Sequence, residues 1–133
     1  MIEEKAKKIY RTLLIICAVD FIAVTIVHQM GIKLPMLFVF YNIPSERYQD
    51  LIISFLSFGW AMLFGIGFMD EEMRPRVQVP IMIAGIAAIC GLIRTRMEIQ
   101  FHDEINYEII SLAVLLFTMI TTYILAVTKK GSK

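Results

Sequence analysis

Four long apolar runs, separated by charged segments, limit what this chain of 133 residues can fold into. The runs cover residues 12–30, 51–69, 77–93 and 109–127. A helix needs roughly 20 mostly apolar residues to cross a bilayer, and each run is close to that length. Short connections between helices favour antiparallel neighbours. The sequence therefore predicts an all-α membrane protein, a four-transmembrane-helix up-down-up-down bundle. We expect one domain over residues 1–133, with spans at about 10–30, 48–69, 77–100 and 106–128.

Composition supports the same class of protein. Hydrophobic residues make up 58% of the chain and charged residues 19%, whereas an average soluble domain carries about 25% charged residues. A net charge of +1 provides no basic surface for nucleic acid, so the bilayer is the expected partner. Cys17 and Cys90 lie in separate apolar runs without a C-x-x-C pair, which argues against a thiol–disulfide enzyme.

The segments between the runs predict helix ends and one irregular connection. Residues 1–11 carry four basic side chains and are typical of a helix that starts at the membrane interface. Residues 31–49 form the longest connection, whose apolar part at 36–41 either lies in the interface or folds over the bundle as a lid. Pro75 is expected to keep the charged turn at residues 70–76 from continuing as helix. Pro80 is then expected in the first turn of that span, where proline is tolerated.

The distribution of basic residues predicts the orientation. If both termini share one side, nine Lys and Arg residues lie on that side and four on the other. Basic residues are enriched in cytoplasmic segments of membrane proteins. We therefore expect a multi-pass protein of the cell membrane with both termini in the cytoplasm.

Polar side chains recur at helical spacing at the same predicted depth in all four spans. Residues four apart share a helix face. The four sets are Asp20 with His28; Arg47, Asp50, Ser54 and Ser57; Arg94, Glu98 and His102; and Glu104, Glu108 and Ser111. Charges in hydrocarbon are costly and must face protein, water or one another. The sequence thus predicts a polar chamber in the outer half of the bundle. Its predicted ligand-binding residues are Asp20, Arg47, Asp50, Arg94, Glu98 and Glu108.

Three of these candidates have structural alternatives. Asp20 is either a proton site or the anchor of a cationic ligand, or else it forms a structural ion pair with Arg94 or Arg47 or a hydrogen bond to a neighbouring helix. Arg94 and Glu98 form either an ion pair within one helix or a clamp for an anion. Small residues at every fourth position, such as Ser57, Ala61 and Gly65, predict close packing of helices.

Metal, cofactor and nucleophile chemistry have little support. His28 and His102 are weak metal candidates, together with Glu98, Asp103 and Glu104, because no H-x-x-x-H spacing is present. No G-x-S-x-G motif or phosphate-binding glycine loop occurs. We therefore expect no resident cofactor and lean against an enzyme, although an acid–base reaction on a lipophilic molecule has no sequence signature that separates it from binding.

Several short motifs resemble those of small four-helix DoxX-like membrane proteins. They are Asn42 with Arg47 before a glycine-bearing span, Gly91-Leu92-Ile93-Arg94 before an acidic turn, and Glu108 early in the last helix. The glycine expected soon after the arginine is absent, since Tyr48-Gln49-Asp50 stands there. The resemblance implies a four-helix bundle and no particular activity.

The leading functional hypothesis is a membrane protein whose outer-half chamber binds a small amphiphilic or lipid-like molecule. The near balance of acidic and basic candidates suggests a neutral or zwitterionic ligand, or no ligand. One alternative is a proton- or ion-coupled transporter or channel subunit that uses Asp20, acting as a homo-oligomer. Another is a structural partner subunit of a membrane complex.

Overall fold

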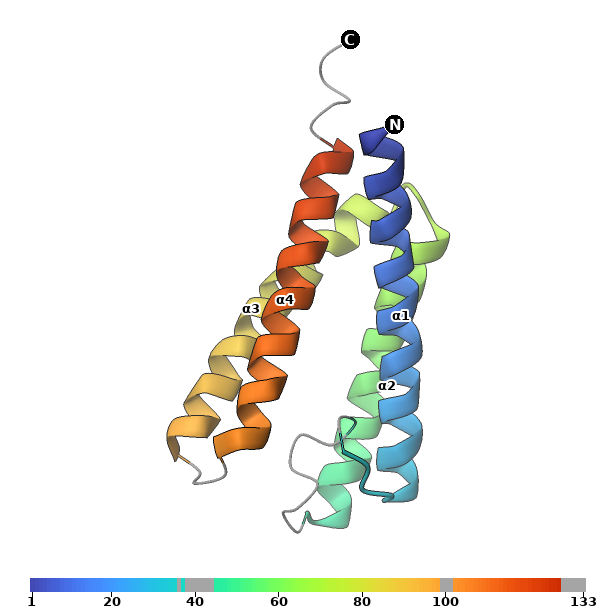
Figure 1. Ribbon diagram of the computed structural model, residues 1–133. Helices are drawn as coiled ribbons and strands as arrows, with labels where there is room; N and C mark the ends of the chain where they lie inside the picture. The colour runs from blue at the N-terminus through green and yellow to red at the C-terminus, as the bar shows by residue number, and fades with distance from the viewer. Residues whose placement is uncertain (36, 38–44, 99–101, 128–133) are drawn as a thin grey trace.

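The computed structural model describes the chain apart from residues 36, 38–44, 99–101 and 128–133, and apart from the side chains of residues 102–105. Its four helices are α1 (Ile2–Met30), α2 (Arg47–Met69), α3 (Arg74–Glu98) and α4 (His102–Val127) (Figure 1). Each helix is long and apolar enough to cross a membrane. The predicted all-α four-helix bundle is confirmed, and its properties fit a multi-pass membrane protein.

The helices form two antiparallel pairs. α1 packs along α2 over most of their length, and α3 packs along α4. Figure 1 shows the pairs close together near the two termini and diverging toward the opposite end of the bundle. We call that opposite end, where α1 leads into α2 and α3 leads into α4, the distal end.

The packed core lies nearer the termini and takes side chains from all four helices. Its buried members are Tyr10, Leu14, Cys17, Ala18, Phe64, Val77, Ile81 and Met119. Gly67 permits close approach of α2 to its neighbours, because a Cβ there would lie 2.9 Å from a methyl group of Val77. Gly65 has no atom within 4 Å of such a Cβ, so this predicted small-residue position is not a close helix contact, whereas Ser57 and Ala61 are buried.

Helix boundaries near the terminal end agree with the predictions for α1 and differ for α3. α1 begins at Ile2, so the basic segment at residues 1–11 starts the helix as expected. α3 begins at Arg74, so the expectation that Pro75 stops the helix was wrong. Pro75 instead occupies the first turn, where its missing N–H has no intrahelical partner to lose. Pro80 consequently lies inside α3. The end of the third span at 99–101 lies outside the described residues.

Arg74 fixes the turn between α2 and α3. Its buried guanidinium donates from Nε to the carbonyl of Gly67 at 2.8 Å and from Nη2 to that of Phe68 at 3.2 Å. These are carbonyls at the end of α2 that lack helical partners. In the same turn, Glu71 pairs with Lys7 of α1 at 3.0 Å. The hydrogen bond and positive charge of Lys7 lower the pKa of Glu71 below its ordinary value of 4.5.

Candidate functional site

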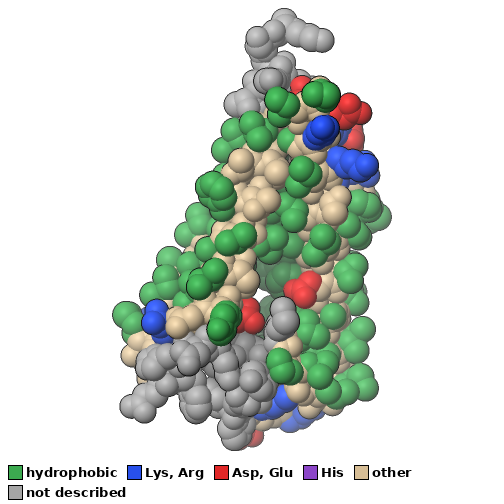
Figure 2. Space-filling model, in the orientation of Figure 1, with side chains coloured by type: hydrophobic (Ala, Val, Ile, Leu, Met, Phe, Trp, Pro, Cys, Tyr) green, Lys and Arg blue, Asp and Glu red, His purple; other side chains and the backbone are tan. Residues whose placement is uncertain are grey.

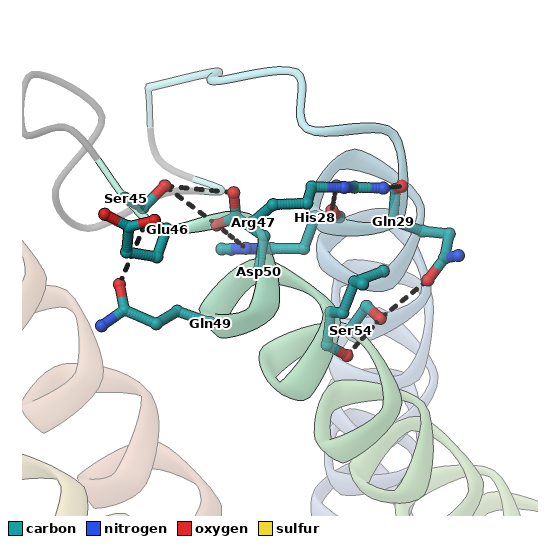
Figure 3. A network of polar contacts seen from close by, with 9 residues as sticks. His28, Gln29, Ser45, Glu46, Arg47, Gln49, Asp50 and Ser54 are labelled. Atoms are coloured by element: carbon teal, nitrogen blue, oxygen red, sulfur yellow. Dashed lines mark hydrogen bonds and ion pairs between the residues drawn. The ribbon is translucent and has the colours of Figure 1, made fainter.

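The distal ends of α1 and α2 are held together by an arginine that caps one helix from the start of the next. α1 ends at Gly31, whose φ of 71° is in the left-handed region that favours glycine. Arg47, the first residue of α2, donates from Nη1 to the carbonyl of His28 at 2.9 Å and from Nη2 to that of Gln29 (Figure 3). A cation beside these carbonyls also complements the negative end of the helix dipole. Arg47 is therefore occupied by backbone groups.

A buried polar pair lies directly beneath this cap. His28 Nδ1 is 3.2 Å from Asp50 Oδ1, and the two side chains are only 6% and 7% exposed. The hydroxyl of Ser45 donates to the same carboxylate, at 3.2 Å to Oδ1 and 3.0 Å to Oδ2. One turn further along α2, Ser54 donates to Gln29 Oε1 at 3.0 Å. We call the group of His28, Gln29, Ser45, Arg47 and Asp50 the distal clasp (Figure 3).

Next to the distal clasp, a cavity of about 950 Å³ lies between the two helix pairs. All four helices contribute to its wall, which is mostly aliphatic and aromatic. Core residues Cys17, Phe64, Ile81 and Met119 close it on the side of the termini. Figure 2 shows acidic side chains in the hollow between the helices, with hydrophobic side chains around it. The cavity lies in the distal half, at the level of the predicted polar chamber, but its wall is mostly apolar.

Two carboxylates face this cavity from opposite helix pairs. Asp20 comes from the middle of α1, and Glu108 comes from the second turn of α4. Both side chains line the same cavity. Within the described part of the chain, neither carboxylate has a hydrogen bond or an ion pair. The alternative of an ion pair between Asp20 and Arg94 or Arg47 is therefore not supported by a contact among these residues. Asp50 also lines the cavity, but its carboxylate is already contacted by Ser45 and His28 within the distal clasp.

The remaining predicted ligand residues are not brought to the cavity. Arg94 and Glu98 form the intrahelical pair that was one of the two alternatives, with Nε 2.9 Å from Oε1. Their side chains are 78% and 62% exposed, and neither lines the cavity. The physical reason is rotation of α3, which directs Ala84, Ala88 and Gly91 toward the cavity instead. Whether any of the six residues binds a ligand stays a prediction.

The predicted metal ligands are not brought together among the described residues. His28 is engaged with Asp50, and the side chains of His102, Asp103 and Glu104 lie outside the described residues. Among the residues that were described, no group of three or more His, Cys, Asp or Glu side chains is arranged to hold a metal ion. The predicted aromatic lid residues Phe38, Phe40 and Tyr41 also lie outside the described part of the chain.

Sequence reasoning missed several polar residues with structural roles. Arg74 belongs to the predicted charged turn at residues 70–76, and no sequence signal indicated that its side chain caps α2. Ser45 and Gln49 line the cavity, and Gln49 accepts a hydrogen bond from the backbone N–H of Glu46 at 3.2 Å. Gln78 is fully buried at the terminal end of α3, although it was counted within an apolar run.

Comparisons with known proteins add no identification. No protein-family model matches the chain, and neither curated proteins nor solved structures gave a significant match. The resemblance to DoxX-like proteins therefore stays a prediction. Four helices that are long and apolar enough to cross a membrane fit a multi-pass membrane protein.

Proposed function

We propose that this protein binds a small amphiphilic molecule in the cavity between its two helix pairs. The observation that carries the proposal is the cavity itself, at about 950 Å³ with an apolar wall and a few polar groups. Ligand sites in proteins typically have volumes of about 300–1,000 Å³ and this kind of lining. An amphiphile fits because Phe21, Trp60 and Phe64 provide an apolar wall, while Asp20 and Glu108 provide polar groups.

The closed side of the cavity favours binding over conduction. The core residues that form its floor are tightly packed, and Leu14 beside them is fully buried. A transporter is the second candidate, because Asp20 faces the cavity without an ion-pair partner among the described residues. Transport would require this floor to open. The distribution of basic residues further supports our proposal that the termini are cytoplasmic, which fusion of reporter domains to the C-terminus would test.

Two neighbouring alanines of α3 offer a matched test. Ala88 lines the cavity and Ala87 does not, although both side chains are exposed. Phenylalanine at position 88 would fill part of the cavity, while phenylalanine at position 87 would add the same side chain on the outside. Protein purified in mild detergent is analysed by native mass spectrometry for a co-purifying small molecule.

We expect wild-type protein and Ala87→Phe to retain a bound molecule and Ala88→Phe to lose it. The proposal fails if occupancy is equal in all three proteins, or if none of them retains or takes up any amphiphile. Helical circular dichroism verifies that Ala88→Phe has folded before its occupancy is compared.

A further inference from the structure

We infer that the molecule bound in the cavity is a cationic amphiphile, whose positive group lies between Asp20 and Glu108. This inference rests on the proposed function and specifies its ligand class. It replaces the neutral or zwitterionic ligand expected from the sequence, because the structure removes the basic candidates from the cavity and leaves the acidic ones.

The charges around the cavity do not balance. Among the described residues that line it, there are three carboxylates and no Lys or Arg side chain. Asp50 is already contacted by His28 and Ser45. Arg47 is engaged by the carbonyls at the end of α1, and Arg94 pairs with Glu98 on the outside. Asp20 and Glu108 are what remains, and both are negative when ionised.

Two carboxylates that line the same apolar cavity, without a partner among the described residues, repel each other when both are ionised. Coulomb energies rise as water is excluded and the effective dielectric constant falls. A single positive charge between them is attracted by both, whereas an anion is repelled by both. The repulsion between the two carboxylates therefore favours the binding of a positively charged ligand over a negatively charged one.

The rest of the wall indicates an organic cation rather than a metal ion. Hard metal ions such as Ca²⁺ need six or more oxygen ligands, and the described wall offers two free carboxylates amid hydrocarbon. Phe21 packs against Phe64 and Trp60, with ring centroids 5.5 Å and 6.5 Å apart, and Trp60 lies 6.3 Å from Phe64. Aromatic faces bind alkylammonium groups and also cover apolar chains. This aromatic group lines the same cavity as the two carboxylates.

Trp60 provides a direct readout, because it is the only tryptophan in the chain and lines the cavity. Purified protein in nanodiscs of zwitterionic lipid is titrated with three probes of equal chain length: decyltrimethylammonium, decanol and decanoate. The trimethylammonium group keeps its charge at every pH, so the comparison isolates the sign of the charge. We expect decyltrimethylammonium to change Trp60 fluorescence with an affinity at least about tenfold higher than decanol, and decanoate to bind most weakly.

Variants then assign the preference to the two carboxylates. Asp20→Asn and Glu108→Gln keep side-chain shape and remove an unpaired charge, so both are expected to fold. Each should weaken decyltrimethylammonium binding about tenfold or more and leave decanol unchanged. Glu98→Gln is the matched control, because Glu98 is exposed outside the cavity, and it should bind all probes like wild type. Comparing variants in identical nanodiscs cancels partitioning of the probes into lipid.

The two proposals fail in different ways. If the three probes bind with equal affinity and Ala88→Phe abolishes all of them, the cavity binds amphiphiles and the inferred preference for cations is wrong. If the cation binds best but neither carboxylate variant weakens it, the assignment to Asp20 and Glu108 is overturned. If no probe changes Trp60 fluorescence, the proposed function fails with the inference.

Discussion

Replacement of Arg47 by methionine should destabilise the protein by about 1–2 kcal/mol. Methionine keeps much of the apolar stem and removes the two guanidinium donors to the carbonyls of His28 and Gln29. Hydrogen bonds from charged groups contribute about 1.5–3 kcal/mol, and exposure of Arg47 to solvent reduces that value. A cation near a helix C-terminus adds about 0.3–1 kcal/mol. The total exceeds what an exposed ion pair provides.

Arg94→Met is the control, because it breaks an exposed i,i+4 pair worth about 0.3–0.5 kcal/mol. Both variants are unfolded in mixed micelles by increasing the fraction of dodecyl sulfate, with helicity and Trp60 fluorescence as probes. The free energy of unfolding of Arg47→Met should lie about 1 kcal/mol below that of Arg94→Met. Equal values would show that the cap on α1 contributes nothing measurable, and a larger loss for Arg94→Met would refute the roles given to both arginines.

Three further outcomes follow from the same contacts. Gly31→Ala should lower the free energy of unfolding by about 1–2 kcal/mol in the micelle assay, because alanine is strained at a positive φ. Gly59→Ala should raise it by up to about 1 kcal/mol, because no atom lies within 4 Å of the added Cβ. Gly67→Ala should cost about 1–3 kcal/mol, since its methyl group would overlap a valine of α3, and a stability equal to that of Gly59→Ala would contradict the close approach. The ion pair between Glu71 and Lys7 stabilises the fold at pH values above 4.5. This stabilisation is lost as the pH falls through the lowered pKa of Glu71 in the folded state. Lys7→Ala should therefore lose less stability than wild type between about pH 5 and 3. Parallel pH profiles would show that this ion pair does not cause the loss of stability in acid.

The helices were predictable because each is written as an apolar run bounded by charge. The irregular features were less so. Pro75 was taken as a helix stop, although proline is equally suited to a first turn, and the sequence alone does not say which side of the boundary it occupies.

The depth of the polar cluster was predictable, but its composition was not. Spacing places Asp20 and Glu108 at matching levels, and the structure brings both to one cavity. Spacing does not give the rotation of a helix about its axis, which decides whether Arg94 faces inward or outward. Nor does it show that backbone carbonyls, invisible in a pattern of side chains, engage Arg47 and Arg74. For this reason Arg47 and Arg94 were predicted to be ligand-binding residues.

The two capping arginines also relate stability to the order of synthesis. Arg47 follows α1 in the chain and Arg74 follows α2, yet each contacts carbonyls at the end of the helix before it. A nascent chain that stops before residue 47 leaves the last turn of α1 without this donor, and one that stops before residue 74 does the same to α2. Each helix end is thus completed only when the ribosome has added the first residue of its successor.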